Sequence, residues 1–208
     1  MKQVITKDGS VTFYNSEFDE VYHSKSGAVE EAVEKHAKQA DLNRLKEIKV
    51  LDVCFGIGYN SAAALDLFTG EKIEIVGLEN DPKIIAKISE ISPEFKSWNI
   101  IKKAASALAY VDDKVKLKII IGDARKTIKD LGKGFDVVFL DPFSPAKCPE
   151  LWTFEFISDI AKVCNKGAVL TTYSCARKVR ENLTKAGFKV TDGLHVGRYA
   201  PSTIAKLI

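Results

Sequence analysis

The stretch Val50-Leu51-Asp52-Val53-Cys54-Phe55-Gly56-Ile57-Gly58-Tyr59-Asn60 joins a short apolar run to a pair of glycines and a helical pattern. Val50–Cys54 reads as a buried strand, and Asn60–Phe68 has the apolar spacing of a helix. Two glycines at a strand-to-helix turn let the backbone approach a ligand closely, and the helix offers its N-terminus to that ligand. The stretch therefore predicts a strand, a ligand-binding turn and a helix.

The same alternation of strand and helix continues along the chain. Further strands are predicted at Lys72–Leu78, Leu117–Gly122, Phe135–Leu140 and Ala168–Tyr173, and two closing strands at Lys189–Asp192 and Arg198–Leu207. Helices are predicted at Pro82–Ile91, Ile100–Tyr110, Arg125–Leu131, Thr153–Val163 and Ala176–Ala186. This order predicts an α/β, Rossmann-like fold: a mostly parallel seven-stranded sheet with helices on both faces. Ligands of such sheets bind outside the carboxyl ends of the strands.

The first 45 residues follow a different pattern. Val11–Tyr14 could form a strand, Ser16–Ser26 reads as an irregular segment, and a helix is predicted from Ala28 to about Ala40. We expect residues 1–45 to be an N-terminal appendage that packs on the sheet or covers the site as a lid. Residues 46–208 are expected to form the main domain.

The composition is that of an ordinary globular protein, with 208 residues of which 46% are hydrophobic. No stretch approaches the roughly 20 apolar residues of a membrane span. Met1–Gly9 lacks the apolar core of a signal peptide, so we expect a cytoplasmic protein without membrane association. The chain has four cysteines, which are Cys54, Cys148, Cys164 and Cys175. Because they form no C-x-x-C pair and have no histidine at metal spacing, we expect no disulfide and no metal.

Charge is unevenly distributed along the chain. The formal net charge is +3, but basic residues outnumber acidic ones only after residue 100. This asymmetry permits a polyanionic partner, although a solvated lysine-rich surface would look the same. Arg177, Lys178 and Arg180 follow a predicted strand end, where a site would lie, and we expect them to bind the substrate. The histidines are not assigned to catalysis: we expect His36 on the surface of the N-terminal helix, whereas His23 could reach the site if the appendage folds over it.

Acidic residues at the strand ends indicate the cofactor. Glu79 ends the second predicted strand, where a carboxylate can accept hydrogen bonds from both hydroxyls of a ribose. Asp52 would repel a pyrophosphate, and Ser61 stands where a dinucleotide site has a third glycine. S-adenosyl-L-methionine, which carries an ammonium and a sulfonium, fits better. Asp123 could accept from its adenine, cap the helix that begins at Arg125, or do both.

The loop Asp141–Trp152 follows the fourth predicted strand and contains three prolines. Proline fixes φ and disfavours helix for the residue before it, so this loop loses little conformational freedom when a substrate docks. By itself, an Asp-Pro loop is typical of a turn. Its place after the fourth strand, facing the cofactor site, predicts the acceptor-side wall, and we expect Lys147 to contact the substrate.

This loop, together with Thr171–Ala176, Val179-Arg180 and Ala186-Gly187-Phe188, resembles the methyltransferase domain of the bacterial bifunctional enzyme that completes 5-methylaminomethyl-2-thiouridine at the tRNA wobble position. The resemblance extends to Phe55–Asn60 and, more loosely, to the appendage, and it covers nearly the whole chain. We expect no flavin-dependent oxidase domain in this chain of 208 residues. The resemblance therefore implies a stand-alone class I S-adenosylmethionine-dependent methyltransferase that acts on tRNA.

Carried over to this sequence, the resemblance implies specific roles. It assigns the cofactor to Asp52, Gly56, Gly58, Glu79 and Asp123. It places Asp141 beside the methyl-accepting amine, with Tyr22 and Phe143 lining the pocket. The chain departs from the family at Cys54 and Pro142, where glycine is usual, and it only partly matches the family's ending at Gly197–Tyr199.

We predict an N-methyltransferase that methylates the aminomethyl group of 5-aminomethyl(-2-thio)uridine in tRNA. Alternatives are a polyamine aminopropyltransferase, a small-molecule amine methyltransferase and, from another class, a non-catalytic RNA- or nucleotide-binding module. Asp52 argues against the aminopropyltransferase, because an acid there has a purpose if the cofactor keeps its amino-acid tail. Asp141 is expected to orient the amine, while apolar Phe143 and Trp152 offset its preference for the ammonium form by desolvation.

Overall fold

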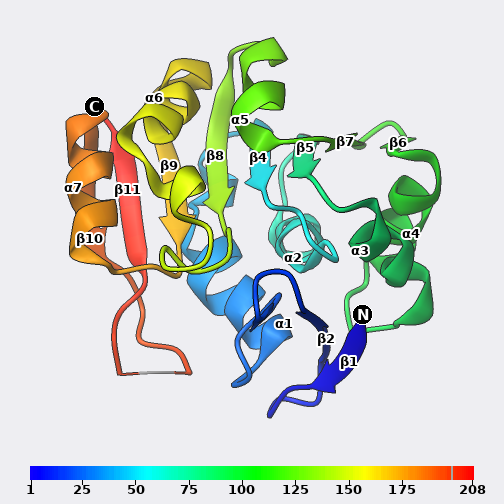
Figure 1. Ribbon diagram of the computed structural model, residues 1–208. Helices are drawn as coiled ribbons and strands as arrows, with labels where there is room; N and C mark the ends of the chain where they lie inside the picture. Colours follow the sequence, from blue (N-terminus) through cyan, green and yellow to red (C-terminus); the bar gives the residue numbers. More distant parts are fainter. Residues whose placement is uncertain (198) are drawn as a thin grey trace.

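The computed structural model describes residues 1–197 and 199–208, so Arg198, where the last predicted strand begins, lies outside the described residues. Its centre is an eight-stranded sheet in the order β10-β11-β9-β8-β4-β5-β7-β6 (Figure 1). The parallel strands are β4 (Glu47–Val53), β5 (Lys72–Glu79), β7 (Val115–Ile121), β8 (Phe135–Leu140) and β9 (Cys164–Thr172). Strands β5 and β7 extend the sheet on one side of β4, and the later strands β8 and β9 extend it on the other side. Ligands of such sheets bind at this switch point in the strand order.

Antiparallel strands form both edges of this sheet. At one edge, β10 (Phe188–Asp192) pairs with β11 (Thr203–Leu207), which pairs with β9 and confirms the predicted closing strands. At the other edge, β6 (Ala109–Val111) is the eighth strand, and the sequence did not predict it. The helix predicted through Tyr110 ends at Ala107, because Leu108 adopts a left-handed conformation with φ 57° and directs the chain back along β7.

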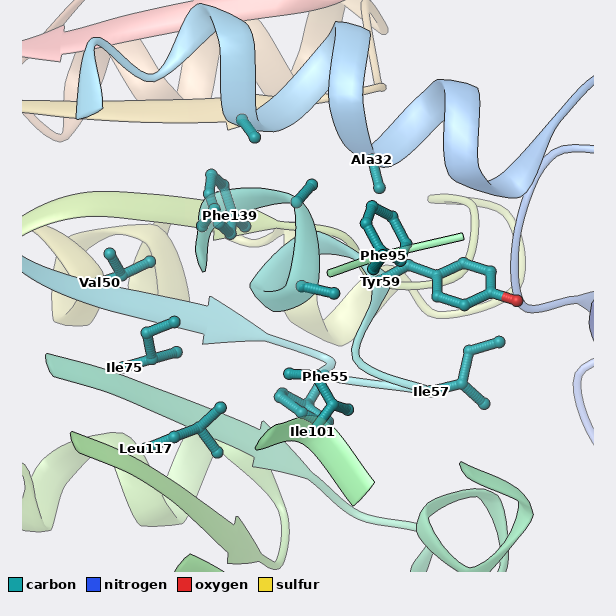
Figure 2. Packing of buried hydrophobic residues seen from close by; sticks show 14 of the residues in the cluster. Ala32, Val50, Phe55, Ile57, Tyr59, Ile75, Phe95, Ile101, Leu117 and Phe139 are labelled. Carbon is teal, nitrogen blue, oxygen red and sulfur yellow. The ribbon is translucent and has the colours of Figure 1, made fainter. Parts of the chain in front are cut away.

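Helices cover both faces of the sheet. On one face lie α2 (Tyr59–Leu67), α3 (Pro82–Lys87), continued by a 3₁₀ turn (Ile88–Glu90), and α4 (Trp98–Ala107). On the other lie α5 (Ala124–Thr127) with a 3₁₀ turn (Ile128–Asp130), a 3₁₀ turn (Pro149–Trp152), α6 (Phe154–Val163) and α7 (Arg177–Lys185). Neighbouring residues of β4 point to opposite faces: Val50 joins the first core, shown in Figure 2, and Leu51 joins the second. The α/β fold with a doubly covered sheet is thereby confirmed.

The N-terminal segment forms a layer of its own. Strands β1 (Lys2–Ile5), β2 (Val11–Asn15) and β3 (Glu20–Val21) make a small antiparallel sheet. A helical stretch follows, made of α1 (Ala28–Glu31), a π turn (Ala32–His36) and 3₁₀ turns (Ala37–Gln39 and Leu42–Arg44). In Figure 1 the small sheet, in dark blue, lies at the edge toward which the arrows of β8 and β9 point, and the helical stretch, in lighter blue, continues behind these strands. The small sheet therefore lies at the carboxyl ends of the strands, where the site is expected.

The predicted surface position of His36 is wrong, since the side chain is completely buried. Small residues, Ala32 and Ala37 among them, bring this segment close against α2 and β9. The π turn ends at His36, and the imidazole lies edge-on to Phe139 of β8, with 5.8 Å between ring centroids. The helical periodicity of the sequence could not reveal this insertion, because a π turn changes which side chains face inward.

Candidate active site

The turn after β4 is held in a shape that depends on glycine. Gly56 and Gly58 have φ values of 56° and 81°, in the left-handed region that favours glycine. A Cβ on Gly58 would lie 2.8 Å from the ring of Phe55 and 2.9 Å from Ile101, so no larger residue fits. Cys54, at a position where the resemblance leads one to expect glycine, also adopts a positive φ of 64°. A cysteine in this conformation has a conformational cost that a glycine would avoid.

Glu79 connects this turn to the end of β5. One carboxylate oxygen, Oε2, accepts from the backbone N–H of Gly56 at 2.8 Å, and Oε1 accepts from those of Asn80 and Asp81, both at 2.9 Å. Burial raises the pKa of Glu79, while the three N–H donors favour the charged form. The carboxylate is therefore fixed in position at the strand end and faces a cavity.

This main cavity lies at the carboxyl ends of β4, β5, β7 and β8. Its lining includes four carboxylates, contributed by Glu79, Asp123, Asp141 and Glu150. Asp123 caps α5 by accepting from the N–H of Arg125 at 2.9 Å, and it also forms an ion pair with that guanidinium, which lowers the pKa of Asp123. The predicted helix cap is thus present. Because acids outnumber the single arginine of the lining, the cavity suits a cationic ligand better than a pyrophosphate.

Asp52 and Gly58 do not belong to the described lining of this cavity. Asp52 is fully buried; its Oδ2 accepts from Ser61 Oγ at 2.6 Å, and its Oδ1 has no hydrogen-bond partner. Burial raises the pKa of Asp52 to about 7. The structure thus brings Gly56, Glu79, Asp123 and Asp141 together at the cavity and places Asp52 behind the glycine turn. A cofactor contact by Asp52 stays a prediction.

The N-terminal appendage closes one side of the cavity with aromatic rings. Phe18 stacks on Phe143 of the proline loop with 4.7 Å between centroids, and Tyr22 lies against the same ring at 5.0 Å. The Tyr22 hydroxyl donates to Asp81 at 3.3 Å, and burial raises its pKa. Glu20 accepts from the backbone N–H of Ser144 at 2.9 Å and fastens the appendage to the loop. Tyr22 and Phe143 therefore line the cavity, and their contact with a substrate stays a prediction.

A second pocket meets the main cavity at Asp141. It is lined by residues of the appendage, including Glu20, Glu31 and Lys35, and by Tyr173 at the end of β9. The lining shared by both spaces consists of Tyr22, His23, Asp141 and Phe143. Two molecules, one in each space, would thus meet beside the Asp141 carboxylate.

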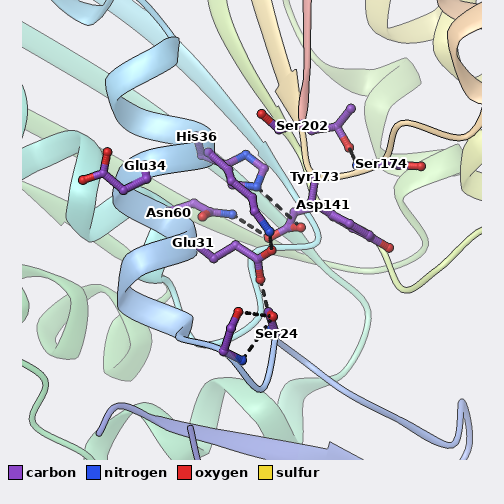
Figure 3. A network of polar contacts seen from close by, with 12 residues as sticks. Ser24, Glu31, Glu34, His36, Asn60, Asp141, Tyr173, Ser174 and Ser202 are labelled. Atoms are coloured by element: carbon purple, nitrogen blue, oxygen red, sulfur yellow. Dashed lines mark hydrogen bonds and ion pairs between the residues drawn. The ribbon is translucent and has the colours of Figure 1, made fainter. Parts of the chain in front are cut away.

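Asp141 is held by residues that the sequence analysis did not single out (Figure 3). Asn60, in the first turn of α2, donates to Oδ2 at 2.9 Å, and His36 Nε2 lies 3.6 Å from Oδ1, which is an ion-pair distance. Burial alone would raise the pKa of Asp141, but His36, His23 and Asn60 outweigh it and hold the pKa below its ordinary value. Asn60 could have been suspected from its position just after the glycines, whereas no local pattern points to His36.

A family model described as S-adenosyl-L-methionine-dependent methyltransferase matches residues 87–207, which is more than half of the chain. The chain belongs to this family. The methyltransferase is 32% identical to MnmC2 from Aquifex aeolicus, whose crystal structure superposes with a TM-score of 0.83 over 99% of this chain and 70% of that chain. This similarity, together with the curated relatives below, makes it a methyltransferase domain of the MnmC type.

Two curated relatives match over most of the methyltransferase. An uncharacterized protein of Methanocaldococcus jannaschii is 34% identical over 209 residues, which cover 97% of this chain and 58% of that protein. The tRNA 5-methylaminomethyl-2-thiouridine biosynthesis bifunctional protein MnmC of Paraburkholderia xenovorans is 26% identical over 215 residues, which cover 88% of this chain and 33% of that protein. The methyltransferase thus spans between a third and somewhat over half of these relatives.

The cofactor of the methyltransferase is S-adenosyl-L-methionine, and the residues of the main cavity fit it. Glu79 can accept from ribose hydroxyls with the lone pairs that its backbone donors leave free. The acidic lining suits the positive charge of the sulfonium. Asp123 at the far end of the cavity is the candidate partner of the adenine amino group, which stays a prediction.

The predicted basic substrate contacts lie away from both spaces. Arg180 donates to Asp192 at 2.6 Å and to Thr203 at 3.0 Å, so it braces α7 against the closing strands. Arg177 is exposed and forms an ion pair with Glu181 at 2.9 Å, and Lys178 is exposed beside a separate surface groove. Lys147 forms an ion pair with Asp19 at 3.2 Å. Contact with a substrate by these residues remains a prediction, and it requires a substrate that extends well beyond the pocket.

Long apolar helices and clusters of metal-binding side chains are absent from the described part of the chain. No helix there is long and apolar enough to cross a membrane. No three His, Cys, Asp or Glu side chains gather as a metal site within residues 1–197 and 199–208. The four cysteines are free thiols.

Proposed function

We propose that the protein transfers the methyl group of S-adenosyl-L-methionine to the aminomethyl group of 5-aminomethyl(-2-thio)uridine at the wobble position of tRNA. The observation that carries this proposal is the placement of Asp141, where the main cavity and the second pocket meet. A cofactor in the cavity and an amine in the pocket would face each other across this carboxylate.

The lining of the second pocket supports a nucleobase that bears an amine. Carboxylates of Glu20, Glu31 and Asp141 provide acceptors for amine protons, and Lys35, held at 2.6 Å from Glu31, provides a donor. Tyr22 and Phe143 supply aromatic surface on which a planar base can stack. This combination of stacking surface and acidic groups favours a base over a flexible polyamine.

The chemistry asks the protein mainly for alignment. Methyl transfer to an amine is an in-line displacement, and a well-oriented pair of reactants can gain about 7–11 kcal/mol from positioning. The cofactor supplies the electrophilic methyl group. Asp141 accepts a hydrogen bond from the amine and aims its lone pair, and the proton that the amine loses goes to water or to Asp141. The aromatic rings of the appendage exclude bulk water from the junction.

Relatives support the choice of tRNA. The name of the bifunctional MnmC protein assigns it to tRNA 5-methylaminomethyl-2-thiouridine biosynthesis. Exposed Arg177 and Lys178 on α7 would then contact the tRNA backbone outside the pocket. The proposed substrate also places the protein in the cytoplasm.

Labelled S-adenosyl-L-methionine tests the proposal. The protein is incubated with tRNA that bears 5-aminomethyl-2-thiouridine, and the tRNA is digested to nucleosides; we expect the label in the wobble nucleoside. Unmodified tRNA and free spermidine serve as control acceptors. Label in spermidine or another small amine, but not in the tRNA, would refute the tRNA substrate. Retention of tRNA without incorporation would indicate a binding module.

A further inference from the structure

His36 is a buried imidazole aimed at the carboxylate where the two spaces meet (Figure 3). Its Nδ1 lies 3.2 Å from the hydroxyl of Thr171, so this side of the ring is hydrogen-bonded. Its Nε2 faces Asp141 Oδ1 at 3.6 Å and has no hydrogen-bond partner. The residue closes a π turn, and such irregular turns are frequent at functional sites. Packing alone does not explain a polar atom left in this position.

Acidic groups surround His36 on several sides. Asp141 faces it from the end of β8, Glu31 from α1 and Asp52 from β4. Burial by itself lowers the pKa of His36, but these carboxylates outweigh burial and raise it above its ordinary value. Of the neighbouring bases, Lys35 is paired with Glu31, and burial lowers the pKa of His23. His36, whose Nε2 faces Asp141 Oδ1, is therefore the base that is placed to carry a positive charge beside Asp141.

This charge removes a difficulty in the reaction. A buried carboxylate without a counter-ion would hold an aliphatic amine as ammonium, whose nitrogen has no lone pair to attack a methyl group. We propose that His36 is a positioning residue for methyl transfer: it balances the charge of Asp141, so that the amine at Asp141 is held in its neutral form. The proposal rests on the proposed amine acceptor, but the ion pair can be tested without any acceptor.

The pH profile of kcat distinguishes this role from a purely structural one. H36Q keeps a hydrogen-bond donor toward Asp141 and removes the charge. We expect the acidic limb of the kcat profile to move up by about one unit or more, which lowers kcat about tenfold per unit below the limb, without a rise in KM. H195Q is the matched control: it replaces an exposed histidine that lines neither space, so the limb keeps its position. A rate that falls by one factor at every pH in H36Q would overturn the proposal.

A titration by NMR tests the ion pair in the absence of any acceptor. The chain has three histidines, and the resonances missing from H36Q identify His36. We expect the pKa of the His36 imidazole to lie above its ordinary value in the wild type and to fall by about one unit or more in D141N. A His36 pKa at or below its ordinary value, or one that D141N leaves unchanged, would overturn the proposal even if tRNA is methylated. Conversely, a failure to methylate tRNA would refute the proposed function and leave this result standing.

Discussion

The E79Q variant is predicted to bind the cofactor much more weakly. Oε1 of Glu79 accepts from two backbone N–H groups and Oε2 accepts from one. In glutamine one of these oxygens becomes an NH₂ group, which then faces a backbone donor in either orientation of the amide. A hydrogen bond to a charged group contributes about 1.5–3 kcal/mol. If one ribose hydroxyl loses its charged acceptor, affinity falls by about 10–150-fold. The buried backbone donor left without a partner adds a loss of about 1–3 kcal/mol in folding stability.

Isothermal titration with S-adenosylhomocysteine measures this change without any methyl acceptor. E74Q is the matched control, since Glu74 lies on the same strand but forms only partly exposed ion pairs with Lys49 and Lys116. Such pairs contribute little, so E74Q should bind like the wild type. A folded E79Q protein that binds S-adenosylhomocysteine within twofold of the wild type would refute the assignment of Glu79 to the ribose.

The remaining predictions concern catalysis, the glycine turn and pH. D141N should bind S-adenosylhomocysteine normally and lose at least about 100-fold in kcat; near-normal turnover would contradict the role of Asp141. G58A should lower the free energy of unfolding in urea by about 1–3 kcal/mol, because its Cβ would lie 2.8 Å from Phe55, whereas G132A, with nothing within 4 Å, serves as the control. Asp52 has a folded-state pKa of about 7 against an ordinary 3.8, so the folded protein holds a proton that the unfolded chain releases. The free energy of unfolding should therefore fall as the pH rises from about 4 to 7, by up to about 1.4 kcal/mol per pH unit. D52N should flatten this slope in urea titrations.

The sequence predicts best those elements whose pattern has a single physical explanation. Phe135–Leu140 is found at its exact bounds, because a run of apolar residues buried on both faces can only be a central strand of a parallel sheet. The strand β6 is missed because three residues at an exposed edge carry almost no pattern. Glu79 and Asp141 are predicted as site residues for a related reason: Glu79 ends β5 and Asp141 directly follows β8, and the fold brings the ends of these strands to one cavity.

Contacts between distant parts of the chain are what the sequence hides. His36 and Asp141 are far apart in sequence, and their pairing requires the appendage to fold back over the sheet. The same holds for Glu20, whose carboxylate fastens β3 to the proline loop at Ser144. Each of these residues belongs, by local pattern, to a polar surface segment. Only the tertiary structure shows that the segment is covered.

The proposed function makes the appendage part of the catalytic apparatus. The turn after β4 and Glu79 belong to the sheet and line the cavity that we assign to the cofactor of the family. The second pocket, by contrast, takes Glu20, Glu31 and Lys35 from residues 1–45, and His36 comes from the same segment. A Rossmann-like sheet can thus keep its cofactor chemistry while its N-terminal layer changes the acceptor. It follows that substitutions within the appendage should alter which amine is methylated, and those in the glycine turn should alter cofactor binding for every acceptor alike.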